Sequence, residues 1–376
     1  MSNIAKRTFH IFLALVLTCP CAYSIRADET EPDVYDRIWD YGKLYSSDDG
    51  LFRTFDLSGR LQAEAVWFDA DQGDFDDILW RRFRFGFKSR LANDWVMQLE
   101  GDFDLNKSAG DWYNRLTDAY VGWKPGSHLD LRILKHSAGF TLDGATSSKE
   151  LLTLQRSNLT NNLWFTTEYF TGVSAKGTSH NGLKYRAGVF SASGDPEISL
   201  SEGGLFVLSS LGYDWGGAFG MDKAEWRLDY VHNQEDAENA TRDFSDVVSL
   251  VGKFEKNRWG LWTDLAAGKG YFDQPDIWGL SLMPFYNTTD RTQLVFRYTY
   301  LSSDGENGLR LARYQDDVTA GRGDGYNEFY FGFNVFFYGH KLKWQNELQY
   351  ATMDDASGDG GEYDGWGLST GLRISW

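Results

Sequence analysis

From residue 54 to residue 376, apolar and polar side chains alternate with a period of two, the pattern of a β-strand with one apolar face. Phe83, Phe85 and Phe87, for example, share one face of their segment, and cations occupy the other. Such segments run for roughly 10 to 15 residues, the length of tilted strands that cross a membrane. We predict sixteen strands, approximately at 54–68, 79–91, 94–105, 115–124, 128–137, 168–177, 182–192, 204–214, 223–233, 245–255, 258–267, 275–285, 291–301, 326–338, 341–351 and 364–376.

The connections between these strands alternate in length. Every second gap is short, and the gaps between them are mostly longer and polar, as at 69–78, 106–114, 138–167, 234–244, 302–325 and 352–363. Short periplasmic turns and long extracellular loops alternate in this way in outer-membrane barrels. The pattern therefore predicts an all-β fold, a 16-stranded antiparallel transmembrane β-barrel over residues 54–376, in the outer membrane of a Gram-negative-type bacterium. The high aromatic content of 16% fits the aromatic girdles of such barrels.

The N-terminal region is expected to be separate from the barrel. Lys6 and Arg7 precede a short apolar run, and small residues follow it, which is typical of a secretory signal peptide at residues 1–27. Residues 28–53 are acidic and aromatic without a clear period, and we predict a short N-terminal periplasmic segment there. Both cysteines lie within residues 1–27, so the mature chain is expected to hold no disulfide and no cysteine-ligated metal.

Charge and motifs exclude several classes of function. Removal of residues 1–27 would lower the formal charge from −17 to −20, which argues against a nucleic-acid-binding protein. No nucleotide-binding or metalloprotease motif appears. His128 and His136 lie on one strand about 26 Å apart, too far to share a metal. We therefore expect no enzymatic activity, no cofactor and no metal. The alternative is a membrane hydrolase assembled from serine, histidine and aspartate or asparagine of different strands.

The polar face of the strands is expected to line a water-filled lumen, because charges that face lipid are costly. The second strand stands out, since its inward row carries Arg82, Arg84, Lys88 and Arg90 and no acid. The longest connection, 138–167, contains six leucines that an exposed loop would have no reason to carry. We predict that this third loop folds inward and narrows the pore.

The sequence resembles the phosphate-selective porins, the porin O and P family of Gram-negative outer membranes. The resemblance runs from about Leu57 to Trp376. The stretches that carry it are Trp80-Arg81-Arg82-Phe83-Arg84, the block from Trp95 to Phe103, Thr117-Asp118-Ala119-Tyr120-Val121-Gly122, and Thr146-Ser147-Ser148-Lys149-Glu150. Their order and spacing, rather than any one of them, carry the resemblance.

The resemblance implies a homotrimeric channel for small anions such as phosphate, embedded in outer-membrane lipid and lipopolysaccharide. It also implies an anion site built from an arginine pair, an aspartate and the third loop. Guanidinium, ammonium and hydroxyl groups together replace part of the hydration shell of a phosphate. With the inward row of the second strand included, the candidate constriction residues are Arg81, Arg82, Arg84, Lys88, Asp118, Ser147, Ser148, Lys149 and Arg156. Arg81 has the wrong parity for the lumen, and we expect a strand end there.

The acidic loops are where the sequence departs from an anion channel. Acids crowd the first predicted loop, 69–78, and the last, 352–363. Screening at physiological salt limits the reach of these charges, so a cationic constriction is expected to dominate and to favour anions. The alternatives are a general non-selective porin and a barrel that serves as an adhesin or receptor through its acidic loops. Divalent-cation binding is a further alternative for these acids.

Overall fold

The computed structural model describes residues 33–164 and 168–376. The chain divides into two compact units, residues 1–41 and 42–376. Within the first, the described part holds one helix, α2 (Val34–Asp40). The predicted signal peptide, residues 1–27, lies outside the described residues.

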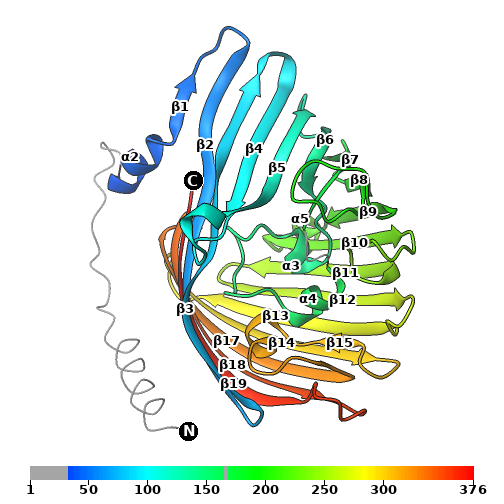
Figure 1. The fold of residues 1–376 in the computed structure, drawn as a ribbon. Coiled ribbons are helices and arrows are strands. Elements are labelled where there is room, and N and C mark those ends of the chain that lie inside the picture. Colours follow the sequence, from blue (N-terminus) through cyan, green and yellow to red (C-terminus); the bar gives the residue numbers. More distant parts are fainter. Residues whose placement is uncertain (1–32, 165–167) are drawn as a thin grey trace. The chain divides into compact units, whose positions relative to one another are not determined.

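The second unit is a closed β-barrel (Figure 1). Each wall strand pairs antiparallel with its sequence neighbours, and the ring closes where β19 pairs with β2. The predicted sixteen-stranded barrel is thus confirmed. Its strands are β2 (Phe52–Ala70), β3 (Gly73–Leu91), β4 (Trp95–Phe103), β5 (Tyr113–Trp123), β6 (Asp130–Ser137), β7 (Tyr169–Thr178), β8 (Lys184–Ser191), β9 (Leu205–Asp214), β10 (Lys223–Asn233), β11 (Phe244–Lys256), β12 (Trp259–Gly270), β13 (Ile277–Asn287), β14 (Thr292–Ser303), β17 (Gly325–Tyr338), β18 (Leu342–Asp354) and β19 (Tyr363–Ser375).

The remaining elements are short. No helix in the described ranges is long and apolar enough to cross a membrane. Inside the predicted N-terminal segment 28–53, β1 (Lys43–Ser46) pairs with the start of β2, so part of that segment is ordered on the barrel. The others are η1 (Ala92–Asp94), η2 (Ala109–Asp111), α3 (Leu142–Ala145), α4 (Asn158–Leu163), α5 (Gly216–Phe219), β15 (Leu309–Arg310), α6 (Arg313–Asp316) and β16 (Arg322–Gly323).

The prediction of a loop at residues 69–78 is wrong. β2 and β3 continue through most of it and leave only Asp71 and Gln72 between them. Strand alternation persists there, because Phe75 and Leu79 pack inward against Tyr314. A buried apolar face thus extends the hairpin beyond the predicted strand ends, although its outer positions are acidic.

The third loop, described over residues 138–164, is bonded to side chains of the wall that face away from the exposed apolar stripes. Asp229 of β10 accepts a hydrogen bond from the N–H of Thr141, and Asp264 of β12 accepts one from Leu142 at 2.7 Å. From the other side of the ring, Asn334 of β17 donates to the carbonyl of Leu152. Contacts with strands on both sides of the ring place the segment in the lumen.

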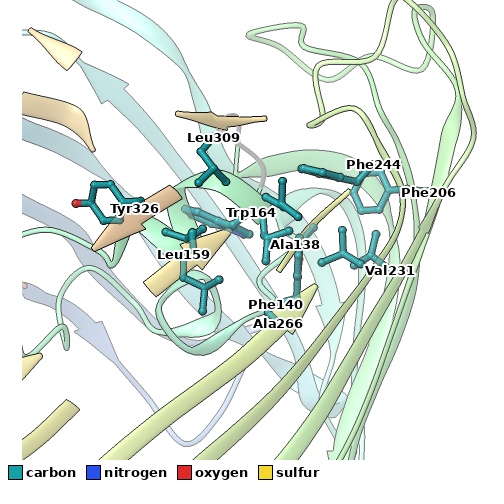
Figure 2. Close-up of a cluster of buried hydrophobic side chains, with 14 of the residues drawn as sticks. Ala138, Phe140, Leu159, Trp164, Phe206, Val231, Phe244, Ala266, Leu309 and Tyr326 are labelled. Carbon is teal, nitrogen blue, oxygen red and sulfur yellow. The ribbon is translucent and has the colours of Figure 1, made fainter. Parts of the chain in front are cut away.

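A second connection, residues 304–324, also enters the lumen, which the sequence did not predict. Asn158 and Asn162 of α4 both donate to the carbonyl of Arg310. Leu309 and Leu311 are buried in one apolar cluster with α4 and the wall. Figure 2 shows part of this cluster, with Leu309, Trp164 and Leu159 near its centre and wall residues such as Tyr326 and Phe206 around them. The two segments therefore pack against each other as well as against the barrel.

This packing explains why the inner wall is partly apolar. On β7 to β14, inward positions near the loop ends of the strands carry side chains such as Phe170, Phe206 and Val247, which are at most 1% exposed. The inserted segments cover these residues and fill that side of the lumen. The strands from β2 to β5 instead keep charged inward rows, and the cavities described next lie along them.

Candidate anion-binding site

A β-bulge brings two consecutive arginines to the lumen side of β3. Gln62 of β2 stands opposite Arg82, but the next residue, Ala63, stands opposite Trp80, so Arg81 is the extra residue. A bulge breaks the strict alternation of side chains. The expected strand end at Arg81 is therefore wrong, because β3 extends to Gly73. The bulge, rather than a strand end, allows the side chain of Arg81 to point toward the lumen.

Arg81, Arg82, Arg84 and Arg156 line one cavity of about 320 Å³ on the loop side of the barrel. Small-molecule sites typically have volumes of roughly 300–1,000 Å³. Among the described residues, seven arginines and three acids contribute to the lining. The other three arginines are Arg115, Arg242 and Arg313, and the acids are Asp102, Asp104 and Glu168.

The arginines of this cavity differ in how far their charge is neutralised. Arg84 is 2% exposed and forms ion pairs with Asp102 at 3.3 Å and with Glu168 at 3.6 Å. Arg82 donates to the neutral side chain of Gln62 at 2.9 Å, and Arg81 donates to Gln155 at 3.4 Å. Arg84 is therefore a structural cation. Arg82 contributes positive charge to the cavity and has no acidic hydrogen-bond partner in the part of the chain that the structure describes.

Arg156 connects the third loop to this cluster. Its guanidinium donates to the carbonyl of Asp143 at 2.9 Å, stacks over Trp164 at 4.5 Å, and lies 3.8 Å from Glu168. Burial would raise the pKa of Glu168, but the guanidiniums of Arg156, Arg84 and Arg82 together lower this pKa to about 2. Glu168 is thus an anion at all physiological pH values, and it shows how strongly positive this side of the lumen is.

The loop tip, residues 147–149, does not line that cavity. Ser148 accepts a hydrogen bond from Arg60 at 2.6 Å, and Arg60 also pairs with Glu100. Ser147 accepts from the N–H of Lys149 and so holds the local turn. Lys149 donates through Nζ to the carbonyl of Trp376 at 2.9 Å. Burial, and next the nearby Arg60, lower the pKa of Lys149 to about 8.

Lys88 and Asp118 also lie away from the arginine cavity. Lys88 lines a second cavity of about 680 Å³ on the turn side of the barrel, together with Arg90 and Arg132. Asp118 is half-buried on β5 and lines neither cavity. Of the nine residues predicted from the sequence, the structure therefore gathers the four arginines in one cavity and separates the rest along the lumen.

Three arginines that sequence reasoning missed complete the cavity. Arg242 and Arg313 belong to connections between strands, and Arg115 lies at the start of β5. Arg242 and Arg313 also line a neighbouring cavity of about 540 Å³, which Arg310 and Arg322 share. Burial lowers the pKa of Arg242, and the nearby charges of Arg310 and Arg322 lower it further. Period-two counting assigns side chains only within strands, so it had no signal for the loop residues Arg242 and Arg313. Arg115 stands opposite Asp102 beyond a register shift in the β4–β5 pairing, which simple alternation cannot show.

The comparisons with known proteins agree with this architecture. Residues 55–203 match the family of phosphate-selective porins O and P. No curated protein sequence matches this chain. An anion-selective porin from Comamonas acidovorans superposes with a TM-score of 0.60 at 12% identity, covering 86% of this chain and 99% of that one. OmpF of Salmonella typhi, in a complex with daunomycin, gives a TM-score of 0.61 at 14% identity, with 89% and 100% coverage.

OmpT of Vibrio cholerae, in its trimer form, has a TM-score of 0.50 at 14% identity and covers 86% of this chain and 99% of that one. At these identities the superpositions show the fold alone. Fold and family match point to a channel rather than to an enzyme. The chain is an outer-membrane porin of Gram-negative type, and its residues 55–203 match the phosphate-selective porin O and P family.

Proposed function

We propose that this porin conducts small anions passively, and that phosphate is among the anions it favours. The observation that carries the proposal is the excess of arginines over acids in the cavity that contains Arg82. Guanidinium groups present planar donors that match phosphate and carboxylate oxygens, and they stay charged at any physiological pH. The adjoining cavity with Arg310 and Arg322 extends the same chemistry toward the loop side.

The location of these cations explains how they outweigh the net charge of the chain. The surplus of acids lies largely in exposed connections, such as 352–363, where water and salt screen it over about 8 Å. The cavity arginines lie where the inserted segments displace water, and charge interactions are stronger there. An ion at this level of the channel is therefore controlled by the arginines rather than by the mouth.

Planar-bilayer recording with the purified protein tests the proposal directly. Under a potassium chloride gradient, the reversal potential is expected to have the sign of anion preference. Added phosphate is expected to reduce the chloride current as it occupies the arginine cavity. A reversal potential near zero would identify a general porin instead, and absence of any conductance would favour the adhesin or receptor alternative.

Assembly and processing complete the proposal. We propose a homotrimer in outer-membrane lipid and lipopolysaccharide, supported by the family match and by the trimer form of OmpT, whose fold is similar. We also propose that residues 1–27 are removed as a signal peptide and that residues 28–53 are periplasmic. Cross-linking in mild detergent and mass spectrometry of the mature N-terminus test these two points separately.

A further inference from the structure

One strand of the barrel has an unpaired edge on the loop side. β3 extends from Gly73 to Leu91, but its neighbour β4 pairs with it only between Phe83 and Arg90. β4 ends at Phe103, and the chain then leaves the wall. Among the described residues, no strand lies beside residues 73–79 on that side, whereas β2 pairs with them on the other. An edge of this kind is a template for another strand.

The hydrogen bonds of Trp80 show which backbone groups face this edge. Its N–H donates to the side chain of Asn106 at 2.8 Å, and its carbonyl accepts from the same amide at 2.8 Å. In an antiparallel ladder, every second residue points both groups to the same side. The main-chain groups of Asp74, Asp76 and Ile78 therefore face the open edge as well. Of these, the N–H of Ile78 is occupied by the side chain of Asp77.

The side chains at this edge indicate what chemistry would suit a partner. Asp74, Asp76 and Ile78 occupy every second position of the strand and point outward. All three are exposed, and the exposed fraction of Ile78 is 80%. Asp69 of β2 lies directly opposite Asp74, and like charges in that position destabilise a strand pair. Acids that face hydrocarbon are costly, so this part of the hairpin lies outside the membrane. The edge thus combines free backbone groups with two acids and one exposed apolar side chain.

We infer that the edge of β3 at residues 73–79 binds an extended cationic peptide by strand addition. The peptide backbone pairs with Asp74 and Asp76, and its outward lysine or arginine side chains lie beside the two aspartates, since directly opposed side chains are about 5 Å apart. An apolar residue of the peptide covers Ile78. The same acids repel a second copy of this edge. This inference goes beyond the channel function and does not depend on it.

Binding of a labelled peptide that alternates lysine and valine to the full protein in detergent tests the inference. Fluorescence anisotropy is expected to show saturable binding that weakens as salt increases. A second peptide of the same sequence, N-methylated at alternate amides, keeps the charge but cannot pair with the edge. It is expected to bind about tenfold more weakly, because several backbone hydrogen bonds are lost.

Protein variants distinguish the edge from general acidity. Asp74→Asn with Asp76→Asn is expected to weaken binding about tenfold, whereas Glu235→Gln with Glu238→Gln, which removes the same charge from another exposed connection, is expected to leave it unchanged. Asp76→Pro removes one backbone N–H from the edge, and proline is tolerated at such edges. This variant is also expected to bind the peptide more weakly. Equal binding of the N-methylated peptide, or equal loss in both charge variants, would overturn the inference.

Discussion

Replacement of Arg82 by glutamine is expected to reduce anion preference while leaving the barrel intact. Arg82 donates to Gln62, a neutral partner, so its loss leaves no buried acid without a counter-ion. The Coulomb interaction energy between this guanidinium and a monovalent ion about 6 Å away is roughly 0.7 kcal/mol, even at the dielectric constant of water. Removing the charge raises the energy of an anion and lowers that of a cation by this amount. The permeability ratio therefore shifts by up to about 1.4 kcal/mol, or about tenfold.

Salt reduces this effect but does not abolish it. At 0.1 M ionic strength the screening length is about 10 Å, which roughly halves the interaction at 6 Å. We expect the anion-to-cation permeability ratio, measured from reversal potentials in bilayers, to fall between about three- and tenfold in Arg82→Gln. The matched control neutralises Asp74, Asp76 and Asp77 of the hairpin, where a change of less than about twofold is expected. The electrostatic reasoning fails if the wild type prefers cations or if the hairpin variant shows the larger shift.

Three further predictions concern pH, stability and the third loop. Lys149 is charged below its pKa of about 8, so anion preference should decline as pH rises through 8, and Lys149→Met should remove this step in reversal-potential titrations. Arg84→Gln removes the nearest cation from Asp102 and Glu168, which keep only the longer ion pairs with Arg115 and Arg156. Urea unfolding followed by gel mobility should therefore show a loss of about 1.5–3 kcal/mol, and an unchanged midpoint would refute the structural role. Asp264→Ala removes the acceptor of the Leu142 N–H, so single-channel recordings should show larger and noisier conductance. Unchanged conductance and noise would show that this bond does not hold the loop in place.

The strands were predictable because membrane and lumen impose a two-residue period on every wall segment. Where that period alone determines the strand, as in the wall strands from β10 to β14 and from β17 to β19, predicted and observed bounds differ by a few residues at most. The prediction of the first loop was wrong because its many acids are typical of a loop. Phe75 and Leu79 nevertheless continue the inward-facing positions of the strand, and their packing stabilises the hairpin. Polar character at the outer positions is compatible with a strand once that strand leaves the membrane.

The site was only partly predictable, for a different reason. The two-residue alternation placed Arg82 and Arg84 on the inward face, as the structure does. Alternation cannot reveal a bulge, however, because a bulge depends on the register of the neighbouring strand. It also cannot show that residues 304–324 enter the barrel, because their packing against α4 is a contact between distant segments. The position of Lys149, bonded to the carbonyl of Trp376 rather than directed at Arg82, depends on the path of the whole loop.

The bulge at Arg81 has a consequence for how such a channel changes over evolutionary time. Because the extra residue is confined to one strand, deleting it would restore regular alternation without moving Trp80 or Phe83 to the opposite face. One lumen charge can therefore be gained or lost by a single-codon insertion or deletion, while every other strand keeps its register. In this part of the wall, selectivity is adjustable through chain length as well as through substitution.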